Sequence, residues 1–130
     1  MCGNFCYNIK DKKGKRVRTK TLYIASLEKN SGSLVVSIGF MHDLKAKYQS
    51  VAFYRPIISN ERKKDNDIKT ISKLYNLKQS YEKSFGFYSN EVENLIAQNK
   101  HDKIYKKILT DITNLQKEYD FILIEGISKD

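Results

Sequence analysis

Three short apolar runs along the chain are rich in the β-branched and aromatic residues that favour buried strands. They cover residues 21–26, 50–58 and 121–124. Elsewhere apolar residues recur every three or four positions, which is the spacing of helices that bury one face. These helical stretches cover residues 34–47, 67–75, 91–99 and 102–118. Because strands alternate with helices, we predict an α/β fold: a partial doubly wound parallel sheet of about three strands with flanking helices.

The same pattern predicts where these elements end. We expect Pro56 to end the second strand, since proline cannot donate a hydrogen bond to a strand ladder. Asp67 is expected to cap the following helix, and Asn76 to end it. Residues 77–89 have no clear period, so we predict an irregular segment there that packs the aromatic rings around Gly86. The helix residues predicted to face inward include Leu34, Val35, Ile38, Met41, Leu44, Ile68, Ile71, Leu74, Ile104, Ile108, Leu109, Ile112 and Leu115.

The first strand leads through a glycine-containing polar turn into a helix, which is the layout of a phosphate-binding P-loop. A working loop reads G-x-x-x-x-G-K-[ST], in which the lysine neutralises phosphate and the hydroxyl binds Mg²⁺. Here Gly32 stands at the last glycine, but Ser33 and Leu34 replace the lysine and the hydroxyl residue, and Leu27 replaces the first glycine. We therefore predict a degenerate phosphate-binding loop that retains only a helix N-terminus able to hold an anion weakly. Its residues are Asn30, Ser31, Gly32 and Ser33.

Two charged residues are predicted at the carboxyl edge of the sheet, where open α/β sheets bind ligands. Arg55 lies near the end of the second strand, and Glu125 directly follows the third. We expect Gly32, Arg55 and Glu125 to converge as a candidate ligand edge. The alternative for Glu125 is a carboxylate that caps a turn. No catalytic residue and no metal site are predicted, because Cys2 and Cys6 have no second Cys or His pair nearby and are interpreted as reduced thiols.

Positive charge is concentrated at the N-terminal end. Residues 1–20 hold seven basic residues and one acidic residue, so they carry +6 of the net charge of +9. We predict a basic, poorly ordered extension over residues 1–20, or a short hairpin there from Phe5 to Val17, and an incomplete P-loop-like domain over residues 21–130. Basic arms can bind phosphate backbones by releasing counterions. A small nucleic-acid-binding module therefore stays open as an alternative.

Length and hydropathy set further bounds. A chain of 130 residues forms one domain with a modest core. No apolar run approaches the roughly 20 residues that cross a bilayer, and charge near the N-terminus argues against a signal peptide. We therefore expect a cytoplasmic protein. The strand at 121–124 is as apolar as an interior strand, yet little chain follows that could cover it, so the chain is expected to be the front of a longer domain.

Four segments in order resemble a known family: YIASLEKNSGSLVVSIGFM, VAFYRPII, NDIKTISKLYNLKQSYEKSFGF and EYDFILIEG. Together they are similar to the N-terminal domain of long-form bacterial phosphate acetyltransferases, a P-loop NTPase-like domain similar to dethiobiotin synthetase. The loop of that family typically reads like SGKS, whereas this chain has Ser31 to Leu34 there. Arg55 stands where dethiobiotin synthetase has a lysine before its proline, and Glu125 keeps the glutamate of a VEG-like motif.

The resemblance implies a non-catalytic domain with a regulatory or assembly role. The whole enzymes of that family transfer acetyl between coenzyme A and phosphate through a separate C-terminal domain, so the chain alone is expected to be inactive and to need no cofactor. The expected partners are a missing or separately encoded acetyltransferase portion and further copies of the chain, with neither nucleic acid nor membrane. A dethiobiotin synthetase-like, ATP-dependent enzyme remains the other alternative.

Overall fold

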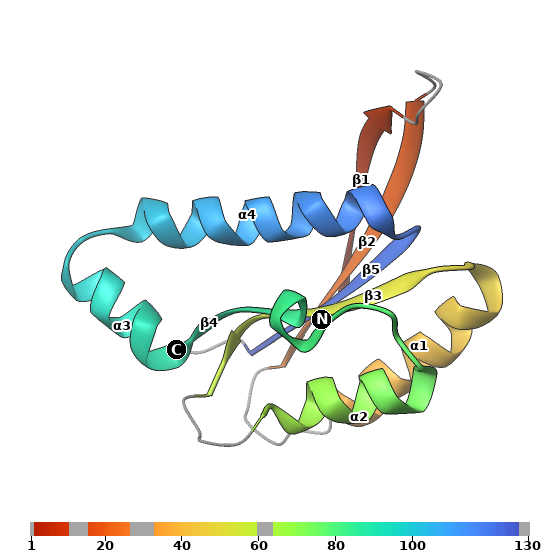
Figure 1. The fold of residues 1–130 in the computed structure, drawn as a ribbon, viewed down its shortest axis with the longest axis horizontal. Helices are drawn as coiled ribbons and strands as arrows, with labels where there is room; N and C mark the ends of the chain where they lie inside the picture. Colours follow the sequence, from red (N-terminus) through yellow and green to blue (C-terminus); the bar gives the residue numbers. More distant parts are fainter. Residues whose placement is uncertain (1, 11–15, 27–32, 60–63, 128–130) are drawn as a thin grey trace.

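The computed structural model describes residues 2–10, 16–26, 33–59 and 64–127. Within these residues one five-stranded sheet has the strand order β1-β2-β5-β3-β4, with helices on both faces (Figure 1). The elements in chain order are β1 (Cys2–Lys10), β2 (Arg16–Ser26), α1 (Ser33–Lys47), β3 (Val51–Ile58), α2 (Asn66–Tyr75), the 3₁₀ helix η1 (Tyr81–Ser84), β4 (Phe85–Tyr88), α3 (Ser89–Ala97), α4 (His101–Glu118) and β5 (Phe121–Ile127).

The predicted α/β fold is confirmed, with one more parallel strand than expected. Among the described residues, β2, β5, β3 and β4 run parallel, and β1 pairs antiparallel with β2. Helices α1 and α2 lie on one side of the sheet and α4 on the other (Figure 1). The extra strand is β4, which falls inside the segment predicted to be irregular. The aromatic packing expected there is present, since the ring centroids of Tyr81 and Phe85 lie 5.3 Å apart.

Strand β5 lies between β2 and β3, and helices that precede it in the chain cover both its faces. Helices upstream of the strand therefore cover it, so its burial does not depend on chain that follows it. Its residues alternate between two cores, as side chains do along any strand. Phe121 and Leu123 pack on the side of α1 and α2, while Ile122 and Ile124 pack on the side of α4. Both cores are buried, which explains why the first four residues of β5 are all apolar.

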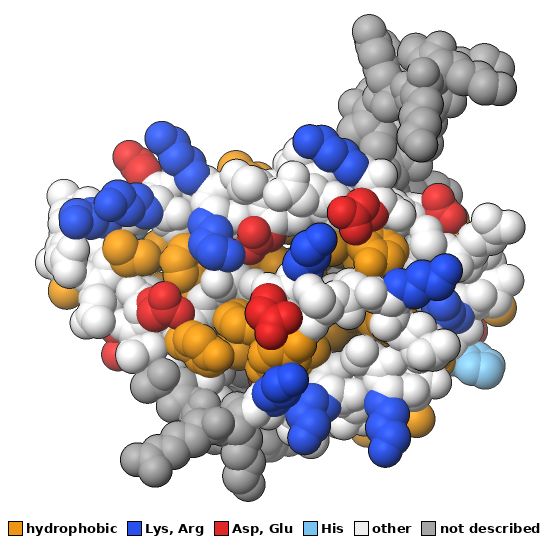
Figure 2. Space-filling model, in the orientation of Figure 1, with side chains coloured by type: hydrophobic (Ala, Val, Ile, Leu, Met, Phe, Trp, Pro, Cys, Tyr) orange, Lys and Arg blue, Asp and Glu red, His pale blue; other side chains and the backbone are white. Residues whose placement is uncertain are grey.

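The N-terminal hairpin is longer than predicted. Strand β1 pairs with β2 from Cys2 opposite Ile24 to Lys10 opposite Arg16. Strand β2 therefore begins before residue 21, the predicted start of the α/β domain, and continues into the sheet, where it pairs with β5 from Lys20 onward. On the face seen in Figure 2, basic and acidic side chains are interspersed and do not form a patch of one sign.

Several predicted boundaries and inward positions are wrong. Pro56 lies inside β3, which tolerates it because the ladder with β5 ends at Tyr54. The N-cap of α2 is Asp65, two residues earlier than predicted, whereas Asn76 ends the helix as predicted, with a left-handed φ of 49°. Helix amphipathicity overestimated burial on three helices, because only one face of each meets the sheet. Three residues predicted to face inward are exposed: Val35, Leu74 and Leu109.

No helix within the described residues is both long enough and apolar enough to cross a membrane.

Gly86 of β4 provides a test of how closely β4 packs against β3. A Cβ added at Gly86 would lie 2.6 Å from Tyr54 Oη and 2.7 Å from the Pro56 carbonyl oxygen. Tyr54 cannot easily move, because it is fully buried and its hydroxyl donates a hydrogen bond to Asp111 Oδ2 at 2.7 Å. We expect Gly86→Ala to lower the free energy of unfolding by about 1–3 kcal/mol. Urea denaturation measures the change.

Gly39 is the matched control for this substitution. It lies exposed within α1, and a Cβ there meets no described atom within 4 Å. Alanine is the better helix former by about 1 kcal/mol, so Gly39→Ala should stabilise the protein. If both substitutions change stability in the same direction, the close packing of β4 against β3 is refuted.

Candidate functional site

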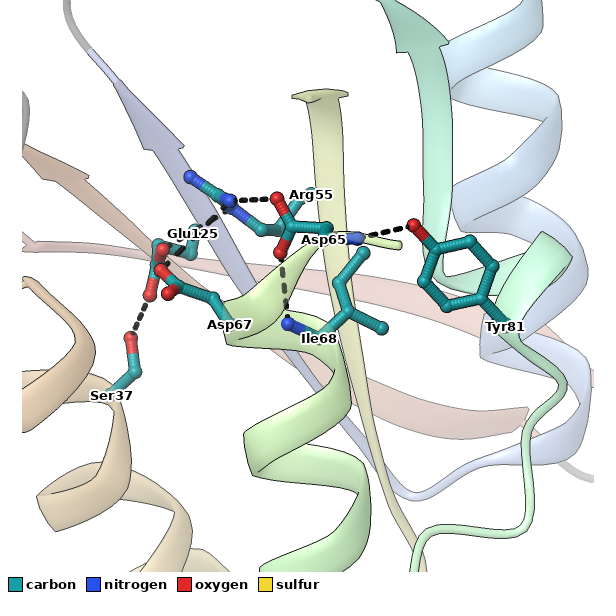
Figure 3. A network of polar contacts seen from close by, with 7 residues as sticks. All are labelled: Ser37, Arg55, Asp65, Asp67, Ile68, Tyr81 and Glu125. Carbon is teal, nitrogen blue, oxygen red and sulfur yellow. Dashed lines mark hydrogen bonds and ion pairs between the residues drawn. The ribbon is translucent and has the colours of Figure 1, made fainter. Parts of the chain in front are cut away.

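The candidate site is a network of buried charges at the point where the pairing of β3 with β5 ends. The last residues that β3 and β5 pair with each other are Tyr54 and Ile124, and the next residues are Arg55 and Glu125. Parallel strands in register place these two residues side by side on the same face of the sheet, the one that α1 and α2 cover. Figure 3 shows both side chains meeting there. Arg55 and Glu125 thus lie in contact, as the sequence predicted.

Arg55 is 8% exposed and contacts three carboxylates among the described residues. Its Nη1 lies 2.6 Å from Asp65 Oδ2 and 3.9 Å from Asp67 Oδ2, and its Nε lies 3.2 Å from Glu125 Oε1. Asp65 and Asp67 come from the start of α2, whereas Glu125 comes from β5 (Figure 3). One guanidinium therefore links two strands and a helix.

Asp65 uses each of its polar groups. One carboxylate oxygen accepts from Arg55, and the other accepts from the backbone N–H of Ile68 at 2.9 Å, which caps α2. Its own backbone N–H donates to the Tyr81 hydroxyl at 2.7 Å, so η1 joins the network. A capping carboxylate near a helix N-terminus also interacts favourably with the helix dipole. The start of α2 is therefore fixed by the same residue that pairs with Arg55.

Glu125 is completely buried. Ser37 of α1 donates a hydrogen bond to its Oε2 at 2.5 Å. Its Oε1 lies 3.2 Å from Arg55 Nε, within ion-pair distance, but these two atoms are not aligned for a hydrogen bond. We conclude that charge alone holds this contact.

Burial raises the pKa of Glu125 to about 7. The Ser37 hydrogen bond opposes that shift, hydrogen bonding to the Asp67 carboxyl adds to it, and the Arg55 charge opposes it. Loss of solvation outweighs the attraction of the guanidinium, as expected for a carboxylate with no exposed surface.

This arrangement leaves Arg55 little capacity to bind an anion. A guanidinium that already faces three carboxylates presents an anionic ligand with net negative charge. Within the part of the chain that the structure describes, no three His, Cys, Asp or Glu side chains are placed to hold a metal ion. The described residues of this cluster are linked to one another by ion pairs and hydrogen bonds.

The sequence identified only part of this site. Asn30, Ser31 and Gly32 lie outside the described residues, and Ser33 is the first residue of α1, with its side chain outside them as well. The contribution of the predicted loop therefore stays a prediction. Sequence reasoning missed Ser37, Asp65 and Asp67 as members of the network. One signal was present, since Ser37 lies on the same face of its helix as Met41 and is fully buried with it.

The Glu125 proton predicts how stability depends on pH. In the unfolded chain Glu125 has the ordinary glutamate pKa of 4.5 and loses its proton near that pH. In the folded protein its pKa is about 7, so it keeps its proton up to about pH 7. Between these values the folded state binds more protons, so the free energy of unfolding falls as the pH rises. We expect this component to amount to about 1–3 kcal/mol between pH 5 and 8. Urea denaturation at several pH values measures it.

Glu125→Gln removes the titration and keeps the shape, so its stability should depend less on pH than that of the wild type. Glu82→Gln is the matched control, because Glu82 is exposed on η1 and should leave the slope unchanged. An equal slope for the wild type and Glu125→Gln would contradict the assignment of the proton to Glu125.

Comparisons with known proteins extend over most of this fold. A family model described as an AAA domain matches residues 20–129. The phosphate acetyltransferase of Synechocystis sp. is 34% identical over 110 residues, which are 83% of this chain and 16% of that protein. The enzyme of the same name from Nitratidesulfovibrio vulgaris is 33% identical over 110 residues, with the same two shares. That of Haemophilus influenzae is 28% identical over 109 residues, 84% of this chain and 15% of that protein.

No solved structure matched the chain significantly. The chain spans about 16% of the length of the first two phosphate acetyltransferases, so the similarity concerns one region of those proteins. The matched residues run from the part of β2 that enters the sheet to the end of β5, and they include all the described residues of the ion network. The chain therefore belongs to a family of AAA domains, the dethiobiotin synthetase-like kind that forms the N-terminal region of phosphate acetyltransferases.

Proposed function

We propose that the chain is a non-catalytic domain with a regulatory or assembly role, related to the N-terminal part of phosphate acetyltransferase. The observation that carries this proposal is the state of Arg55. It is a basic side chain at the carboxyl edge where such folds bind ligands, and it is committed to three acidic partners. A ligand edge whose cation is already paired is better suited to holding the domain together than to binding phosphate.

The chain does not fit the nucleotide and Mg²⁺ that P-loop folds hold. In a working loop the lysine contacts the terminal phosphate, and the following hydroxyl residue binds Mg²⁺. At these positions the sequence has Ser33 and Leu34, and Arg55 does not supply a free positive charge in their place. The degenerate loop is thus part of the proposal, and we assign no hydrolytic step to the chain.

A regulatory or assembly role implies partners. The match covers about one sixth of the first two relatives, so most of each of those proteins lies outside the aligned region. We propose that the domain acts on an acetyltransferase portion, present in the same polypeptide or as a separate one, and that copies of it can associate, in the cytoplasm. The exposed side chains of Tyr105 and Leu109 on α4 offer apolar surface for such contacts.

The proposal predicts no nucleotide binding and no turnover. Isothermal titration of the protein with Mg-ATP should give only heats of dilution, and incubation with acetyl-CoA and phosphate should release no coenzyme A. The Synechocystis phosphate acetyltransferase is the positive control for the turnover assay. Saturable heat with Mg-ATP, or turnover by this chain alone, would contradict a non-catalytic role.

A further inference from the structure

The carboxyl groups of Asp67 and Glu125 meet at the carboxyl edge, although they come from different elements. Asp67 lies in the first turn of α2, and Glu125 lies in β5. Figure 3 shows the two groups pointing toward one another beside Arg55. They are hydrogen-bonded with each other. An ionised carboxylate accepts hydrogen bonds and has none to donate, so this contact requires a proton on one of the two groups.

Two ionised carboxylates would be costly at this position. Glu125 is completely buried, and the side chain of Asp67 is 22% exposed. The nearby cation is Arg55, but its Nη1 lies 2.6 Å from Asp65 Oδ2 and 3.9 Å from Asp67 Oδ2, so Asp65 is its closest partner. One guanidinium does not neutralise three carboxylates. Because carboxylates that share a buried site cannot all ionise easily, one of the two in contact keeps its proton.

Other polar groups that face this pair set its charge. Ser37 of α1 donates to Glu125 Oε2 at 2.5 Å, which favours the ionised carboxylate. The charge of Arg55 favours it as well, whereas burial and the neighbouring carboxyl favour the protonated form. Asp65 places a further negative charge beside Arg55, and its backbone N–H donates to the hydroxyl of Tyr81 in η1. These surroundings suit a pair that holds one proton and one negative charge.

We propose that Asp67 and Glu125 share one proton, and that this proton holds the first turn of α2 against β5, so that its loss releases the start of the helix. Without the proton two carboxylates face each other, and their repulsion moves Asp67, the more exposed of the two, away from β5. This inference rests on the proposed function, because it names proton concentration as a signal to which a regulatory domain can respond.

The pH at which the release occurs follows from the raised pKa of Glu125, which is about 7 and is caused first by burial. Because the two carboxyl groups are in contact, this value describes the pair and not Glu125 alone. Below pH 7 the shared proton is present and the start of α2 is held. Above pH 7 the proton is lost and the contact with β5 opens.

The test follows the first turn of α2 across this pH range. The backbone N–H of Ile68 donates to Asp65 Oδ1 at 2.9 Å, and that of Lys69 donates to the Asp65 carbonyl oxygen at 3.1 Å. Hydrogen exchange of both amides, corrected for the intrinsic effect of pH, gives their protection factors. In the wild type we expect these factors to fall at least about tenfold between pH 6 and pH 8, because each pKa unit gained on closing is a tenfold change in the opening equilibrium.

Asp67→Asn is the variant that isolates the shared proton. Its side-chain amide donates to the ionised Glu125 carboxylate at any pH, so the protection of the Ile68 and Lys69 amides should not fall between pH 6 and pH 8. Asp102→Asn is the matched control, because Asp102 is an exposed acid in the first turn of α4. It should keep the fall seen in the wild type. No fall in the wild type, or an equal fall in Asp67→Asn, would overturn the proposal.

A second measurement needs no variant, so it decides the matter even if Asp67→Asn does not fold. The ¹³C NMR signals of the two side-chain carboxyl carbons are followed from pH 3 to pH 9 in the wild type. Groups that share a proton titrate together, so both Asp67 and Glu125 should shift in the step near pH 7. A step near pH 7 at Glu125 alone would overturn the proposal. Because neither experiment contains nucleotide, binding of Mg-ATP by the wild type would overturn the proposed function separately.

Discussion

The buried charge of Arg55 is the constraint on which this edge of the sheet depends. An ionised group removed from water is costly unless partners replace its hydration, and truncating one partner of a buried pair commonly costs several kcal/mol. Arg55 meets this requirement with carboxylates from α2 and β5. Two of these three acidic residues are in turn held by another element, since Tyr81 of η1 accepts from the backbone N–H of Asp65 and Ser37 of α1 donates to the Glu125 carboxylate. The relative positions of two strands and two helices therefore follow from one side chain.

The sheet brings these groups together through its register. Because β3 and β5 are parallel and pair with each other up to Tyr54 and Ile124, the next residue of each strand, Arg55 and Glu125, lies beside that of the other. On the edge of β3 that faces β4, the backbone hydrogen bonds are made in a different way. Pairing with β4 begins only at Arg55, and before it the amide of Gln79 accepts from Phe53 N at 2.6 Å and donates to Phe53 O at 2.8 Å. A side chain thus satisfies backbone groups that a longer strand would otherwise pair, as buried backbone requires.

Features of the fold and of the site that depend on the local sequence could be predicted, whereas those that depend on tertiary contacts could not. Alternation of strands and helices depends on local composition, so the fold class and the main helices were predictable. The convergence of Arg55 with Glu125 was predictable too, because both follow apolar runs that must lie in a parallel sheet. Strand β4 was not, since four residues around Gly86 carry no periodic pattern and become a strand only by pairing with β3. Asp65 and Asp67 were missed for a related reason: two acidic residues near a helix start look like capping residues, and only the tertiary structure shows that they also face Arg55.

The ion pairs of Arg55 and the proposed loss of the phosphate loop both concern the balance of charge at the carboxyl edge. In a fold that binds a nucleotide and its metal, acidic groups at the carboxyl edge are balanced by ions that arrive with the ligand. A chain without the loop lysine and hydroxyl cannot rely on that supply, yet it keeps Glu125 buried in a strand whose neighbours fix its position. Two internal devices lower the resulting repulsion: the guanidinium of Arg55, and the raised pKa of about 7 at Glu125 that lets it hold a proton near neutral pH. Neither device is needed if an external cation neutralises the acids, so their presence together favours an edge that is stable without a ligand.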